Sequence, residues 1–138
     1  MQSDFLDAHH RHWQDAEFLY AAQRLANADH LYGMAAECGL KRLMQVFGMP
    51  FDDERDRPSV GQDRQHAEKV WVRYETYRSG HHQGVGYGLP SLNPFDDWHA
   101  AQRYAHRSHF SSQRADPHRQ GAREVHQLVS KACLEGLL

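Results

Sequence analysis

The stretch from residue 28 to residue 44, ADHLYGMAAECGLKRLM, decides the fold class of this chain. Its apolar residues recur at helical spacing, which predicts a helix from about residue 30 to residue 47. Asp29 is a suitable N-cap for that helix, and Gly48 is a suitable stop. The apolar face that should pack in the core consists of Tyr32, Ala36, Leu40, Leu43, Met44 and Phe47.

The opposite side of the same helix carries Glu37 and Lys41, which lie four residues apart. Acid before base at this spacing is the order that favours an ion pair along a helix. We therefore expect a Glu37–Lys41 ion pair away from the apolar face.

A helix should precede this stretch, beginning after Ser3 as N-cap and running to about residue 26. The short ANAD connection predicts that the two helices form an antiparallel hairpin. The first helix carries two apolar faces, which indicates either two neighbours, one of them in another subunit, or a helix well buried in its own bundle. One face holds Leu6, Trp13, Ala16 and Tyr20, and the other holds Phe18, Ala22 and Leu25.

The remaining chain also lacks convincing strand periodicity. Residues 49–62 form a charged loop with two prolines, and a helix should follow over about residues 63–78. The next sixteen residues, SGHHQGVGYGLPSLNP, contain four glycines, and a loop of this length is usually functional or disordered. Its GVGYG is not a phosphate-binding fingerprint, because no strand precedes it and no helix directly follows.

Two further helices are expected near the C-terminus, each opened by a proline. One should begin near Pro94 or Phe95, with Asn93 as its cap, and the other at Asp116 and Pro117. The prediction is a single all-α domain over residues 1–138, an up-and-down bundle of four to five helices.

The composition limits the classes of partner. The chain has 138 residues and a formal charge of −2, so any phosphate binding must be local. The N-terminus lacks the apolar region of a secretory signal, and no apolar run approaches the ~20 residues of a membrane span. Cys38 and Cys133 are isolated and fit buried, reduced helix residues. We expect a cytoplasmic protein without a membrane segment.

The candidate site is AAQRYAHRSHF, residues 100–110, which the pattern places on the helix that begins near residue 94. On an ideal helix His99, Arg103 and His106 are surface neighbours. Arg103 and His109 are about 120° apart, so they can grip one phosphate only if the helix distorts or a second copy contributes.

Three interpretations of this stretch compete. Its polar side chains can be solvated residues beside a core stripe, with His109 hydrogen-bonded inside. A metal site could use His99, His106, His109 and the nearby His81–His82 pair. No carboxylate or cysteine stands at ligand spacing among them, however, and the guanidiniums repel cations, so the pattern argues against a metal. Phosphodiester chemistry is the third: arginine binds phosphate oxygens, and histidine transfers protons near neutral pH without a metal.

The chain resembles the HEPN family of small helical domains over nearly its whole length. Residues 28–44 are similar to the family's alanine-rich, glutamate-containing helix that ends in a leucine–lysine pair. The matching positions are Ala35, Ala36, Glu37, Leu40 and Lys41. Arg103 followed after five residues by His109 is similar to the family's arginine–histidine motif, and His66 looks like a histidine that often follows the second helix.

The resemblance implies a homodimer in which two copies of the motif share a cleft. It also implies a metal-independent endoribonuclease that leaves a 2′,3′-cyclic phosphate and needs no cofactor. Arg103 would then be the phosphate ligand and His109 the acid/base, with His106 as a competing imidazole. Arg107 and His99 are further candidates for phosphate or substrate binding.

Two functional hypotheses follow. The first is a dimeric endoribonuclease, the toxin of a pair whose antitoxin is a nucleotidyltransferase. The second is a non-catalytic HEPN-like module that binds a nucleotide, an anion or a protein partner. The neutral overall charge and the absence of a basic tract favour the second over broad RNA binding.

Overall fold

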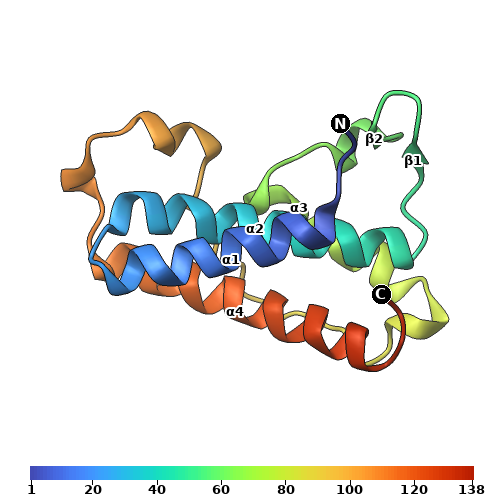
Figure 1. The fold of residues 1–138 in the computed structure, drawn as a ribbon. Helices are drawn as coiled ribbons and strands as arrows, with labels where there is room; N and C mark the ends of the chain where they lie inside the picture. Colours follow the sequence, from blue (N-terminus) through green and yellow to red (C-terminus); the bar gives the residue numbers. More distant parts are fainter.

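A computed structural model describes residues 1–138 as an all-α helical bundle, which confirms the predicted fold class (Figure 1). The four α-helices are α1 (Phe5–Ala21), α2 (Leu25–Val46), α3 (Ala67–Ser79) and α4 (Ser112–Leu134). The bundle is a small, mostly helical domain, compatible with a HEPN-like fold.

The hairpin of α1 and α2 is confirmed, but both helix boundaries differ from the prediction. The N-cap of α1 is Asp4, whose side chain accepts hydrogen bonds from two backbone N–H groups of the first turn. Ser3 instead donates to the carboxylate of Asp56. The turn is tight because Gln23 adopts a left-handed backbone (φ 61°), so α2 already begins at Leu25. Asp29 therefore lies inside α2 and is not its cap.

Helix α2 is the centre of the bundle, and it packs against α1, α3 and α4 (Figure 1). Its predicted apolar face is buried, but so are residues on its other sides. The predicted Glu37–Lys41 ion pair forms at 2.6 Å and is itself buried, with about 6% and 7% of the two residues exposed. The expectation of an opposite polar side fails because neighbours cover α2 all round.

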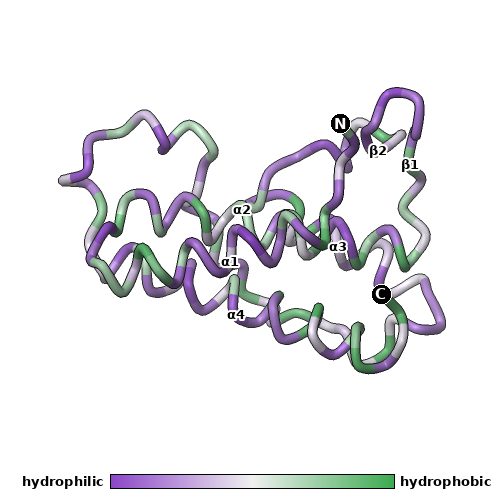
Figure 2. The backbone as a smooth tube through the Cα atoms, in the orientation of Figure 1, coloured by the Kyte–Doolittle hydropathy of each residue, from purple (hydrophilic) through white to green (hydrophobic).

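A small antiparallel hairpin interrupts the predicted 49–62 loop. Strand β1 (Phe51–Asp52) pairs with β2 (Arg57–Pro58), with Phe51 opposite Pro58. The tip of the hairpin is hydrophilic (Figure 2). The following helix α3 begins four residues later than expected, at Ala67, since a 3₁₀ turn occupies Gly61–Asp63.

The long connection between α3 and α4 returns the chain to the end of the bundle where α2 begins (Figure 1). The helix predicted from Pro94 is absent: two 3₁₀ turns, Ala100–Tyr104 and Arg107–His109, stand in its place. None of residues 99–109 is buried, and only Ala100 and Gln102 are partly covered, so a helix here would gain little from tertiary packing; short isolated helices are marginal in water.

Helix α4 begins at Ser112 rather than at Asp116. The side chain of Ser111 accepts a hydrogen bond from the backbone of Arg114 and caps the helix. Pro117 consequently lies inside α4 and not at its first position. The sequence contains two plausible starts, and the capping serine provides the one that the structure uses.

Two glycines allow aromatic side chains of the connection to pack directly against the backbone of α2 and α4. A Cβ at Gly33 of α2 would lie 2.0 Å from the ring of Trp98. A Cβ at Gly121 of α4 would lie 2.4 Å from Pro94 and 2.9 Å from Phe95. Trp98 and Phe95 are fully buried as a result, and they fix the middle of the connection to the bundle.

Both cysteines are free thiols. Cys38 is buried as expected, whereas Cys133 is exposed near the end of α4, which corrects the prediction for that residue. None of the helices combines the length and the apolar character that crossing a membrane would need.

Replacing Gly33 with alanine should destabilise the protein by about 1–3 kcal/mol, because the added methyl group collides with Trp98. The free energy of unfolding in urea measures this change. Gly61→Ala is the matched control, since a Cβ there meets no atom within 4 Å. Equal stability of the two variants would show that the packing of Trp98 does not require glycine at position 33.

Candidate functional site

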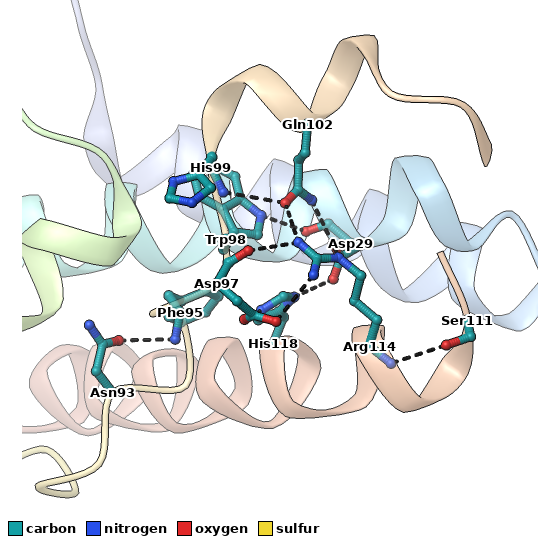
Figure 3. Close-up of polar contacts among 10 residues, drawn as sticks. All are labelled: Asp29, Asn93, Phe95, Asp97, Trp98, His99, Gln102, Ser111, Arg114 and His118. Carbon is teal, nitrogen blue, oxygen red and sulfur yellow. Dashed lines mark hydrogen bonds and ion pairs between the residues drawn. The ribbon is translucent and has the colours of Figure 1, made fainter. Parts of the chain in front are cut away.

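A buried polar cluster joins α2, α4 and the connection between α3 and α4 (Figure 3). Its centre is the carboxylate of Asp29, which is fully buried. Nδ1 of His118, on α4, lies 2.5 Å from Oδ1 of Asp29, and Nε2 of the same ring lies 2.8 Å from Oδ1 of Asp97. The imidazole thus bridges a buried and an exposed carboxylate.

The two carboxylates favour the charged form of His118. Burial by itself lowers its pKa, but the hydrogen bonds and charges of Asp29 and Asp97 outweigh burial and raise the pKa above the ordinary 6.5. For Asp97, burial raises the pKa, but the hydrogen bond from His118 and the charges of His118 and Arg114 lower it overall. His118 is therefore an imidazolium that lies between the carboxylates of Asp29 and Asp97.

Arg114 and Gln102 complete the cluster. Arg114 donates to the Asp97 carboxylate at 3.1 Å and to the Asp97 backbone carbonyl at 2.7 Å. The Gln102 amide donates to Oδ2 of Asp29 at 2.5 Å, while its carbonyl oxygen accepts from Arg114. Trp98 Nε1 donates to the backbone carbonyl of Asp29 at 3.0 Å. Every polar group that the connection brings into this cluster has a partner.

This cluster positions the connection and is not suited to catalysis. His118 is fully buried, and carboxylates occupy both of its ring nitrogens. A general acid or base must reach the proton that it transfers, which His118 cannot do for a ligand in solvent. Its chemical effect is to hold the exposed residues that follow Trp98 in place.

Residues 99–110, here called the arginine–histidine segment, are mostly exposed and contain all the site residues predicted from sequence. The Arg103 guanidinium donates to the Ala100 carbonyl at 3.1 Å and to the Tyr104 hydroxyl at 3.0 Å, and it lies over the Tyr104 ring. It contacts no carboxylate. The prediction that His99, Arg103 and His106 share one face of an α-helix is wrong, because the segment is not an α-helix.

The predicted histidines of this segment lie apart from the buried cluster. His106 and His109 belong to the second 3₁₀ turn and its cap, and Arg103 belongs to the first. Nδ1 of His106 lies 3.0 Å from the Ser108 hydroxyl, whereas His109 makes no side-chain hydrogen bond. The side chain of His99 is exposed, and its backbone N–H donates to Gln102. No hydrogen bond joins Arg103 to His109 within one chain.

Arg107 lines a cavity of about 300 Å³ together with Arg24, Phe110 and the first residues of α2. Neither guanidinium has a carboxylate partner. No side chain caps the N-terminus of α2.

One imidazole that the sequence analysis did not single out lies under the influence of Arg103. His30 of α2 stacks on Trp98, with 5.8 Å between the ring centroids. Burial and the charge of Arg103 lower the pKa of His30. Its Nδ1 is buried without a hydrogen-bond partner. His30 therefore has a lowered pKa, partly because of a guanidinium that forms no ion pair with a carboxylate.

Glu37 and Lys41, the charged α2 residues that carry the HEPN resemblance, form a second polar group with His66. The carboxylate of Glu37 binds Lys41 through Oε1 and lies 3.1 Å from Nδ1 of His66 through Oε2. His66 precedes α3, so this contact ties the start of α3 to α2.

The arginine–histidine segment does not bring three potential metal ligands together. Among the histidine, cysteine and acidic side chains, the one group with ligand atoms close together is His9, His10 and His126, on α1 and α4.

The sequence analysis missed the roles of Asp29 and His118, although both occupy core positions of their helices. Asp29 precedes Tyr32 and Ala36 by three and seven residues, and His118 precedes Ala122 and Val125 by four and seven. A charged residue at each of two such positions indicates a buried pair, since neither would be buried alone.

A comparison with protein-family models finds no match, and searches of curated proteins and of solved structures find none either. The likeness to the HEPN family therefore consists of the residue-level resemblance alone.

Asp29→Ala should destabilise the protein by about 3–5 kcal/mol, because it leaves the buried His118 and Gln102 without their partner. Chemical denaturation measures the loss. Asp96→Ala, which removes an exposed neighbouring carboxylate, should stay close to the wild type. Similar losses in both variants would rule out Asp29 as the centre of the cluster.

The stabilisation from His118 should be complete below its unfolded-state pKa, about 6.5, and should decline as pH rises through the raised folded-state pKa. Asp29, Asp97 and Arg114 are the charged groups that face this ring. The free energy of unfolding of wild type minus that of His118→Gln should therefore shrink as pH rises from about 6 to about 9.

Histidines with lowered pKa, such as His9 and His126, affect stability on the acid side of 6.5, so the alkaline window isolates His118. Replacing the exposed His82 with glutamine provides the control, which should give no such pH dependence. A wild-type advantage that grows with pH would contradict the charged state assigned to His118.

Proposed function

We propose that the protein is a HEPN-like domain that binds RNA phosphates through the arginine–histidine segment and cleaves RNA there without a metal. The observation that carries this proposal is that Arg103 and Arg107 are exposed, lack carboxylate partners and lie in a stretch without any acidic residue. By contrast, Arg114 and Arg119 form ion pairs with carboxylates. Free guanidiniums are available to bind phosphate oxygens in pairs.

The anchoring of the segment supports the same proposal. Trp98 and Phe110 are buried at its two ends, and Gln102 binds Asp29 between them. A segment that is already positioned loses less conformational entropy when it binds a ligand. The buried cluster therefore explains how a non-helical stretch can present a defined binding surface.

The cleavage step uses one imidazole as base and one as acid. The base accepts the proton of the ribose 2′-hydroxyl, the 2′-oxygen attacks phosphorus, and the P–O5′ bond breaks as the acid gives a proton to the leaving O5′. The products are a 2′,3′-cyclic phosphate and a 5′-hydroxyl. Arg103 stabilises the added charge on phosphorus. His109 and His106 are the candidate imidazoles, and His30 is the further candidate on α2.

We propose that a homodimer brings Arg103 of one copy to His109 of the other, since the two residues lie in separate 3₁₀ turns and share no hydrogen bond within one chain. In a toxin–antitoxin pair, the partner would be a nucleotidyltransferase antitoxin.

A non-catalytic module is the second candidate, and the cavity beside Arg107 favours it. About 300 Å³ between Arg24 and Arg107 suits a small anion or the phosphate of a nucleotide better than an extended RNA strand. Under this alternative, the segment binds phosphate and its histidines transfer no proton.

Incubation of the purified protein with end-labelled RNA in EDTA tests the proposal. Arg103→Ala should lower the cleavage rate about 100-fold or more, as expected for losing a transition-state donor. His109→Ala should lower the rate by about 100-fold or more while leaving RNA affinity unchanged. Arg107→Ala should weaken RNA affinity about tenfold, measured by fluorescence anisotropy.

The matched controls are Arg57→Ala and His82→Ala, which remove exposed side chains elsewhere. Cleavage that persists in both Arg103→Ala and His109→Ala would exclude the nuclease mechanism. Anion or nucleotide binding that depends on Arg107, without cleavage, would establish the second candidate instead.

A further inference from the structure

Three imidazoles converge between α1 and α4, away from the arginine–histidine segment. His9 and His10 come from α1 and His126 from α4, and one ligand nitrogen of each lies within 4.8 Å of the other two. Figure 1 shows that α1 begins far from the arginine–histidine segment and ends beside it, while α4 runs along α1. Neither the proposed RNA site nor the buried Asp29 cluster uses these residues.

His9 is held as a metal ligand would be held. It is fully buried, and its Nδ1 lies 2.8 Å from the backbone carbonyl of Ala35, so Nδ1 carries the proton and Nε2 keeps its lone pair. Gly39 of α2 leaves room for the His9 ring, because a Cβ at residue 39 would lie 2.7 Å from Nδ1 of His9. Donation from the distal ring nitrogen to a carbonyl is the usual second hydrogen bond of a metal-bound histidine.

His126 and His10 complete the group. Nδ1 of His126 lies 3.0 Å from Nε2 of His9, and the His126 ring stacks on Trp13 with centroids 4.9 Å apart. The ring of His10 stands edge-on to both, at centroid distances of 5.3 Å from His9 and 5.8 Å from His126. A hydrogen bond between His9 and His126 would need only these two imidazoles, but a ring nitrogen of His10 also lies within 4.8 Å of both.

The electrostatic surroundings favour a cation more than those of the arginine–histidine segment. The charged groups that influence His9 and His126 are other histidines and Glu17, with no arginine or lysine among them. Burial, followed by the charge of His10, lowers the pKa of His126, and burial lowers the pKa of His9 to about 4. Neutral imidazole is the form that binds metals.

We propose that His9, His10 and His126 bind a divalent transition-metal ion of the Zn²⁺ type. Three neutral imidazoles leave the ion its full positive charge, and a tetrahedral ion keeps one position open for water or an anion. On binding, the proton between His9 and His126 moves from Nδ1 of His126 to its Nε2, so no net proton is released.

The required movement is small. Bonds of about 2.0–2.1 Å in a tetrahedral site place ligand nitrogens about 3.3 Å apart. His9 and His126 are already slightly closer than this. The nitrogen of His10 must move by up to about 1.5 Å, which rotation of a half-buried side chain allows. The ion would link two helices through residues 117 positions apart in the sequence.

Titration of the protein, without a histidine tag, with Zn²⁺ in a calorimeter tests the proposal. A single site should appear, and His10→Gln should weaken its affinity at least tenfold, since losing even an outer-sphere partner costs about 10–100-fold. Co²⁺ provides a second probe: the wild type should give the intense visible bands of tetrahedral cobalt, and His126→Gln should lose them.

The double variant His81→Gln/His82→Gln is the matched control, because it removes a stacked histidine pair from a loop and should keep both signals. His10 is half-buried and makes no side-chain hydrogen bond, so its variant tests the proposal even if His126→Gln fails to fold. Equal Zn²⁺ affinity in wild type and His10→Gln, or Co²⁺ spectra of octahedral type, would overturn the proposal. RNA cleavage in EDTA does not depend on this site, so the two proposals fail separately.

Discussion

The contact between the Asp29 carboxylate and the His118 imidazolium is the constraint on which the rest of the structure depends. A carboxylate without exposed surface must be compensated by charge and hydrogen bonds, and here α4 and the α3–α4 connection supply them. The pair therefore fixes how α4 lies against α2. Through Gln102 and Asp97 it also fixes the path of a connection that has no helix of its own.

Close packing and hydrogen bonding act together where the α3–α4 connection meets α2 and α4. Gly33 admits the ring of Trp98 against the backbone of α2, and that ring donates to the Asp29 carbonyl. Gly121 admits Phe95 against α4, where Phe95 stacks on His118 at 5.5 Å between centroids. The exposed Arg103 and Arg107 are thus presented by a rigid base, which is the arrangement that a phosphate-binding surface needs.

The all-α class, the α1–α2 hairpin and most of the core face of α2 could be predicted, because they follow from local spacing. The helix expected at Pro94 could not be excluded from the sequence. Its asparagine cap, proline and alanines satisfy every local rule, but none of residues 99–109 is buried and most are exposed, so a helix there would gain little from packing. Asp29 was assigned as a cap for the same reason: an aspartate before an apolar run fits both a helix start and a buried partner.

The sequence by itself determined where helices can form and which residue types carry phosphate or proton chemistry, since helical periodicity and side-chain chemistry are properties of neighbouring residues. Only the tertiary structure decided which of those residues meet. Asp29 and His118 are 89 residues apart, and His9 and His126 are 117 apart. Such contacts arise from how helices pack, which local spacing does not encode. The packing therefore makes His118 a buried imidazolium and places His9 beside two further imidazoles, where we propose a metal site.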